Sequence, residues 1–133
     1  MRLDTYVNYA GNCEEAFRFY ETHLGAKVIA LMRHGQMPNP NIPKEWHDKV
    51  QHAQLKVGDS ILMGADVPSA LPMRSAYVSL TIDDLADTER IYNALAEQGE
   101  IFMKMEEMFF AKRFAMLRDR FGTSWMILHG VRQ

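Results

Sequence analysis

The sequence has 133 residues, of which 47% are hydrophobic and 24% are charged, and its formal net charge is −2. This length suits one compact domain with its own core, and the composition is that of a globular chain. Lys and Arg are scattered rather than gathered in a basic stripe, which argues against a nucleic-acid partner. The chain has neither a signal segment nor a long apolar run, so we expect a cytoplasmic protein with no membrane partner. Cys13 is the only cysteine, which excludes an internal disulfide and a thiolate-rich metal site.

The first half of the chain predicts a strand, a helix and three further strands. Asn12 and Glu15 form a capping-box pattern before a helix over 13–24, and Gly25 is expected to end that helix. The segment 33–49 contains Pro38, Pro40 and Pro43 and is predicted to be a long loop. The predicted strands of this half cover 5–10, 26–32, 52–57 and 60–64.

The second half predicts the same series of elements. Asp84 is expected to cap a helix over 84–98, which ends near Gly99. Residues 106–113 are predicted to form a turn region. The predicted strands of this half cover 76–82, 100–105, 114–118 and 124–128.

The two halves are also alike in sequence. Residues 6–9 match 77–80 at an offset of 71 (77 − 6), and residues 58–63 match 122–127 at an offset of 64 (122 − 58). Self-similarity in this order predicts two equivalent units that share a core. We therefore expect one domain, 1–133, with an α+β fold of two tandem β-α-β-β-β units at about 3–66 and 75–129.

Two such units in a chain of this length resemble the vicinal oxygen chelate superfamily, which contains glyoxalases, bleomycin-resistance proteins and extradiol dioxygenases. The PhnB-like branch, often described as 3-demethylubiquinone methyltransferase-like, has an opening that resembles YVNYAGNCEEAFRFYETHLGAKV. Its third and fourth strands and its closing hairpin are similar to HAQLKVGDSILMGAD and RDRFGTSWMI. The resemblance covers nearly the whole chain. It implies two half-barrel sheets, a small-molecule ligand and a homodimer, but no Gly-rich first loop supports methyltransferase chemistry.

The resemblance also implies four metal positions, two of His type and two of Glu type. Placed by the repeat to within about one residue, the His-type positions hold Tyr6 and Tyr77, and the Glu-type positions hold Leu62 and Met126 or their immediate neighbours. Divalent first-row ions bind through imidazole and carboxylate donors, which these four side chains do not offer. We therefore expect no metal and no cofactor here.

Without a metal, the concave faces that the resemblance implies become a candidate small-molecule site. Tyr, Asn and Ser side chains would orient a ligand by hydrogen bonds, while Met and Trp would supply apolar contact. The competing interpretation is that these side chains fill the space as a second core. The candidate ligand-binding residues are Tyr6, Asn8, His52, Met63, Tyr77, Ser79, Phe110, Lys112, Trp125 and Met126.

Two segments outside the matching stretches of the repeat are each open to two interpretations. In the first, one of the adjacent Phe109 and Phe110 covers the cleft or a partner chain, and Lys112 or Arg113 meets an anionic group of the ligand. The alternative is a solvated basic pair beside a core Phe. The long loop around Trp46 is either a lid or binding loop, or a dimer arm.

Two classes of function stay open. The first is a binding protein that holds a small, partly aromatic molecule without changing it. The second is an enzyme of lyase, isomerase or dioxygenase type that uses His52 or a Tyr hydroxyl as acid or base. Cys13 stands at a helix start, where a thiol pKa is lowered, but it is also a plausible apolar core contact, and no base is indicated near it. No catalytic residue is therefore assigned, and the missing metal ligands favour the first class.

Overall fold

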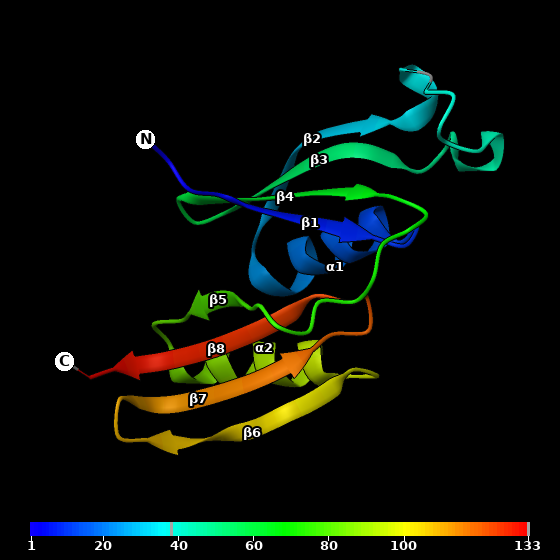
Figure 1. Cartoon of the computed structure of the whole chain (residues 1–133). Helices are drawn as coiled ribbons and strands as arrows, with labels where there is room; N and C mark the ends of the chain where they lie inside the picture. Colours follow the sequence, from blue (N-terminus) through cyan, green and yellow to red (C-terminus); the bar gives the residue numbers. More distant parts are fainter. Residues whose placement is uncertain (38, 133) are drawn as a thin grey trace. The chain divides into compact units, whose positions relative to one another are not determined.

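The computed structural model describes residues 1–37 and 39–132, so Pro38 of the predicted loop lies outside the described residues. The chain divides into two compact units, Met1–Leu71 and Pro72–Gln133. In the described part of each unit, a four-stranded sheet carries an α-helix on one face (Figure 1). The strand order is β1-β4-β3-β2 in unit 1 and β5-β8-β7-β6 in unit 2, which confirms the predicted α+β fold of two β-α-β-β-β units.

Unit 1 follows the predicted order of elements closely. Its first strand pairs in parallel with the last, and the other neighbours are antiparallel. The predicted loop contains two short 3₁₀ helices, η1 (His34–Gln36) and η2 (Lys44–Trp46). The other elements are β1 (Thr5–Tyr9), α1 (Cys13–Leu24), β2 (Lys27–Arg33), β3 (Val50–Val57) and β4 (Ser60–Asp66).

The core of unit 1 lies between α1 and the sheet. Cys13, Phe17 and Tyr20 recur at helical spacing and are fully buried. Phe17 meets the ring of Tyr9 edge-on at 5.9 Å between centroids. Gly64 on β4 permits this approach, because a Cβ there would lie 2.9 Å from Cζ of Phe17. The helix therefore sits close to the sheet, on one face only.

The predicted capping box at the start of α1 does not form. The side chain of Asn12 makes no capping hydrogen bond, and its buried Oδ1 has no partner among the described residues. Instead Oδ1 of Asp66, at the end of β4, accepts hydrogen bonds from the backbone N–H groups of Gly11 at 3.1 Å and Cys13 at 2.9 Å. Its Oδ2 accepts from Val50 N–H at 2.9 Å. A carboxylate from a distant strand thus accepts the first free N–H of the helix, that of Cys13, and adds a negative charge at the helix N-terminus.

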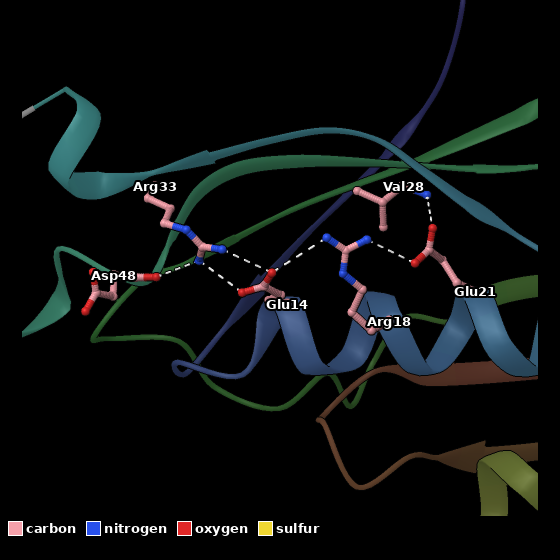
Figure 2. A network of polar contacts seen from close by, with 6 residues as sticks. All are labelled: Glu14, Arg18, Glu21, Val28, Arg33 and Asp48. Carbon is pink, nitrogen blue, oxygen red and sulfur yellow. Dashed lines mark hydrogen bonds and ion pairs between the residues drawn. The ribbon is translucent and has the colours of Figure 1, made fainter.

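A polar network joins α1 to β2 and to the return of the long loop (Figure 2). Arg33 binds both oxygens of Glu14, at 3.0 and 3.1 Å, and donates to the backbone oxygen of Asp48 at 2.9 Å. Arg18 lies between Glu14 and Glu21, and Glu21 accepts the backbone N–H of Val28 at 2.8 Å. The bidentate Arg33 geometry fixes both ends of the loop to the helix.

Unit 2 repeats this arrangement with a better local cap. Asp84 accepts a hydrogen bond from the backbone N–H of Asp87 at 2.8 Å, which confirms the predicted N-cap. The second helix packs on β7 and β8, with Ile91 and Leu95 buried. The elements are β5 (Val78–Thr81), α2 (Leu85–Ala96), β6 (Glu100–Met108), β7 (Ala111–Arg118) and β8 (Ser124–Val131).

Several predicted boundaries in unit 2 differ from those of the structure. The predicted turn over 106–113 is mostly strand, because β6 continues to Met108 and β7 begins at Ala111. Lys112 therefore lies on a strand rather than in a turn. The second helix ends at Ala96, and the left-handed residue after it is Gln98 (φ 59°) rather than Gly99. In the part of the chain that the structure describes, no helix has the length and apolar character to cross a membrane.

Candidate functional site

Each sheet has one face covered by its helix and one opposite face, which we call the open face. In β1, Val7 and Tyr9 are buried toward α1, whereas Tyr6 and Asn8 alternate with them and are exposed. Tyr6 pairs with Met63 on β4, and Met63 pairs with Gln54 on β3. The open face of unit 1 is thus formed by Tyr6, Asn8, His52, Gln54 and Met63.

Tyr6 and His52 lie together on this face. Their ring centroids are 5.8 Å apart and the rings are inclined by 31°. His52 Nε2 is 3.1 Å from the amide nitrogen Nε2 of Gln54, which donates when the imidazole carries its proton on Nδ1. Partial burial raises the pKa of the Tyr6 hydroxyl above its usual value of 10.0, with a smaller effect from Cys13. Near neutral pH, Tyr6 is therefore a hydrogen-bond donor and not a phenolate.

The open face of unit 2 contains Ser79 and Met126. These two residues are partners in the β5–β8 register, and Met126 pairs in turn with Met116 on β7. Ser79 is exposed and both methionines are half-buried. Tyr77 lies directly before β5, where its hydroxyl accepts a hydrogen bond from Arg74 at 3.4 Å.

Two of the sequence-derived positions lie on the helix-covered faces instead. Leu62 is 4% exposed and pairs with Leu55, which is fully buried. Trp125 is 1% exposed, and its indole N–H donates to Oδ2 of Asp119 at 2.8 Å. Trp125 is thus part of the core of unit 2, and the expectation that it lines the same face as Met126 is not met.

Phe110 and Lys112 lie near the β6–β7 hairpin. Phe110 packs edge-on against Phe114 at 5.0 Å, and Phe114 has the same strand parity as Met116. Lys112 is exposed, and its stem crosses Gly130, where a Cβ would lie 2.7 Å from the lysine side chain. Both residues are at the far end of this sheet from Tyr77.

The strand pairing shows that the two sequence matches do not describe one repeat register. From β1 to β4 the partner offset is 57 (Leu62 − Thr5), and from β5 to β8 it is 47 (Trp125 − Val78). These differ by 10, whereas the two sequence offsets of 71 and 64 differ by 7. An odd discrepancy exchanges the two faces of a strand. Leu62 and Met126 therefore face opposite sides of their sheets, and Met63 is the open-face residue on β4.

The residues present do not fit the metal that the superfamily resemblance implies. The open-face residues nearest to the four implied positions are Tyr6, Met63, Tyr77 and Met126, none of which supplies an imidazole or carboxylate. Among residues 1–37 and 39–132, no three His, Cys, Asp or Glu side chains are grouped as a metal site.

Cys13 does not have the environment of a nucleophile. Burial raises the pKa of its thiol strongly, and the nearby carboxylates of Asp66 and Glu14 raise it further. The buried thiol is thus neutral and packed in the core. A helix start alone would lower the pKa of a thiol, but here burial and the two carboxylates outweigh that effect.

Fold and open faces together define a protein of the vicinal oxygen chelate type, and comparison with known proteins agrees. The model of the Glyoxalase/Bleomycin resistance protein/Dioxygenase superfamily matches residues 2–127, so the chain belongs to this superfamily. Protein YjdN of Escherichia coli (strain K12) is 32% identical over 139 residues, covering 96% of this chain and 94% of YjdN.

Two solved structures are similar along almost the whole chain. The crystal structure of protein PA1353 from Pseudomonas aeruginosa is 38% identical, with a TM-score of 0.87 and 98% of each chain covered. A protein from Bacillus cereus titled a putative 3-demethylubiquinone-9 3-methyltransferase, PhnB protein, is 21% identical, with a TM-score of 0.81 over 98% of this chain and 100% of that one. At this identity the second likeness shows the shared fold.

Sequence reasoning missed several residues of the open faces. Gln54 has the same strand parity as His52, so strand alternation gives a signal for it. Met116 lies two residues from Phe114 on β7, so strand alternation gives the same signal for it. For Arg74, and for Phe102 on β6, whose ring packs edge-on against Tyr77 at 6.4 Å and lies 4.1 Å from Cζ of Arg74, the sequence holds no local signal.

Proposed function

We propose that this protein binds a small, partly aromatic molecule on its open faces and does so without a divalent metal. The observation that carries the proposal is the group formed by Tyr6, His52, Gln54 and Met63. It combines a protonated hydroxyl, an imidazole, an amide and a thioether on one exposed sheet face. A few polar groups beside apolar and aromatic surface are the usual character of a small-molecule site.

The donor set supports the metal-free part of the proposal. A first-row ion keeps its water unless several borderline or hard donors converge on it, and thioethers and neutral phenols do not replace them. In unit 1, His52 is the one residue of this group with a nitrogen that divalent ions favour. A single imidazole gives too weak a site to retain a metal through purification.

An enzyme of lyase, isomerase or dioxygenase type is the second candidate. It is favoured by the contact between Gln54 and His52 Nε2, because a fixed imidazole is the arrangement that an acid or base requires. In this reading His52 transfers the proton and Tyr6 orients the substrate. Turnover of a compound in a metabolite extract, lost in His52→Asn, would favour the enzyme over the binding protein.

The assembly and location remain part of the proposal. We propose a cytoplasmic homodimer, since exposed apolar residues on open sheets are commonly covered by a second subunit. Ile29 and Met32 on β2 are 47% and 37% exposed and could contribute to such an interface. Light scattering at micromolar concentration tests this directly, and a monomer there would refute the dimer.

The small-molecule proposal is tested by mass spectrometry of compounds that co-purify with the protein. The wild type is compared with Tyr6→Phe and Met63→Ala, and with Tyr92→Phe as a matched hydroxyl removal on α2. We expect a bound compound whose occupancy falls in the first two variants and is kept in the third. Elemental analysis after exposure to Ni²⁺, Zn²⁺, Mn²⁺ and Fe²⁺ should show no stoichiometric metal. A retained metal would contradict the proposal.

A further inference from the structure

The segment before β5 is held against the end of the unit 2 sheet. Met73 donates its backbone N–H to Gly122 O at 2.9 Å. Its carbonyl oxygen accepts hydrogen bonds from Ser124 Oγ at 2.7 Å and from Arg118 Nη1 at 3.1 Å. These bonds anchor residues 72–77 beside the loop that joins β7 to β8. Arg74 and Tyr77 are consequently brought to a strand, β6, that lies at the opposite edge of the sheet from β5.

Two guanidinium groups gather around one aromatic ring at this point. Cζ of Arg74 lies 4.1 Å from the centroid of Phe102, and Cζ of Arg118 lies 5.6 Å from it. Tyr77 completes the group, with its ring edge-on to Phe102 at 6.4 Å. Phe102 is placed here by a shift in the β6–β7 register between Ile101 and Met103. Stacking on the ring holds the guanidinium of Arg74 in place and leaves donors of Arg74 available, since its hydrogen bond goes to Tyr77. Arg118 uses Nη1 for Met73 O and Nη2 for Glu100, so it contributes its charge rather than free donors.

The charges of this group are not balanced by the protein. The two guanidinium carbons are no more than about 10 Å apart, which is roughly one Debye length at an ionic strength of about 0.1 M, so the two like charges repel most strongly at low salt. Arg118 forms an ion pair with Glu100 at 2.8 Å. For Arg74 the described residues offer no carboxylate within ion-pair distance; its side chain contacts Tyr77 and Phe102. The group thus has two cations and one anion.

The cationic group adjoins the apolar part of the same open face. Arg118 pairs with Ser124, and the next open-face pair along the two strands is Met116 with Met126. Residues two apart on a strand are about 7 Å from each other. A ligand with an oxyanion at the arginines would therefore lay an apolar body of one ring over the methionines, beside Ser79.

We infer that Arg74, with the positive charge of Arg118 beside it, forms an oxyanion site on the open face of unit 2, and that a ligand bound on this face is a small apolar acid, a carboxylate or a phosphate ester. The inference rests on the proposed function and adds the charge class of the ligand. The hydroxyl of Tyr77 provides a further polar contact, and the forked donors of Arg74 suit either kind of oxyanion.

Titrations followed by NMR of the methionine methyl groups test the inference. The probes are benzoate, phenyl phosphate and the uncharged benzamide, added to the whole protein. We expect at least one of the two anions to bind about tenfold tighter than benzamide, because a charge-assisted contact adds roughly that factor. Both the Met116 and Met126 signals should shift. The order of benzoate and phenyl phosphate tells whether the site prefers a carboxylate or a phosphate.

The control variants separate a local site from general charge. Arg74→Gln should abolish the preference for the anions, and Arg74→Lys should keep part of it. Arg90→Gln removes the same charge from α2 of the same unit and should leave the preference intact. Thermal unfolding of each variant confirms that it is folded.

The contrary results are equally distinct. Equal binding of benzamide and both anions, with shifts at Met116 and Met126, would overturn the oxyanion site while leaving the proposed small-molecule function. An equal loss in Arg74→Gln and Arg90→Gln would overturn it as well. Anion-selective shifts confined to residues around Phe102 would support the oxyanion site and count against an apolar ligand on this face.

Discussion

The indole N–H of Trp125 donates to the buried Oδ2 of Asp119 at 2.8 Å, and this bond fixes Trp125 within the core of unit 2. The same carboxylate accepts backbone N–H groups of Phe121 and Thr123, each at 3.0 Å, so it organises the whole turn before β8. Met126, one residue further, consequently faces the open side. Substitution of Trp125 is therefore expected to affect stability, and substitution of Met126 to affect ligand binding.

Trp125→Phe should destabilise the protein without changing its affinity for ligand. The substitution removes one donor from Asp119 and leaves a cavity, so we expect the free energy of unfolding to fall by about 2–4 kcal/mol. Met126→Ala should cost about 1 kcal/mol, since its side chain is half-buried, but should weaken benzoate binding. Urea unfolding and NMR titration measure both. Weaker benzoate binding in Trp125→Phe, with binding unchanged in Met126→Ala, would show that Trp125 rather than Met126 contacts the ligand.

Asp66→Asn should lower the free energy of unfolding far more than Asn12→Ala, although Asn12 is the residue in the N-cap position of α1. The amide of Asn presents N–H toward the N–H of Val50 or of the helix start, leaving a buried donor unsatisfied, and this costs about 1–3 kcal/mol. Asn12→Ala removes a buried oxygen without a partner and should change stability by less than about 0.5 kcal/mol. Chemical unfolding compares the two. The reverse order would show that Asn12 is the true cap.

The ion pair between Glu14 and Arg33 should make stability depend on pH. Arg33 holds the pKa of Glu14 below its usual value of 4.5, so the unfolded state binds more protons in that range. The stabilisation from this ion pair is fully present at a pH above about 4.5, the usual pKa of the carboxyl. It is lost as the pH falls through the lower pKa that Glu14 has in the folded state. Because both side chains are more than a third exposed, the effect is at most about 1 kcal/mol and shrinks in high salt.

Glu14→Gln should therefore be less stable than the wild type at neutral pH, with the difference vanishing in acid. Glu15→Gln removes a carboxylate from the same helical turn without touching Arg33 and serves as the control. Thermal unfolding at a series of pH values measures both. A constant difference between Glu14→Gln and the wild type at all pH values would refute this role of the ion pair.

Cys13 should resist modification while the protein is folded. Burial and the neighbouring Asp66 and Glu14 carboxylates keep its thiol protonated, and the thiolate is the reactive form. A chromogenic disulfide reagent at a pH of about 8 should label Cys13 only after urea unfolding. Rapid, complete labelling of the native protein would contradict the buried position.

The sequence by itself determined the elements whose signals are local. The first helix has the predicted bounds 13–24, because apolar spacing and Gly25, which has φ 66°, mark it within one segment. The order of elements in the two β-α-β-β-β units and the superfamily also followed from short segments of the sequence. The family-model match over residues 2–127 confirms the superfamily. Turn chemistry was less reliable, since pairing between β6 and β7 extends strands through most of the predicted turn.

Only the tertiary structure decided which side chains share a face. A strand side chain points to one side or the other with a period of two, so an offset that is wrong by an odd number of residues places Leu62 on the face that Met63 occupies. The Asp66 cap joins residues more than fifty positions apart, and Arg74 meets Phe102 only because hydrogen bonds to Met73 anchor the segment before β5. Local pattern cannot contain such contacts, because their geometry depends on strand register and on where the chain returns.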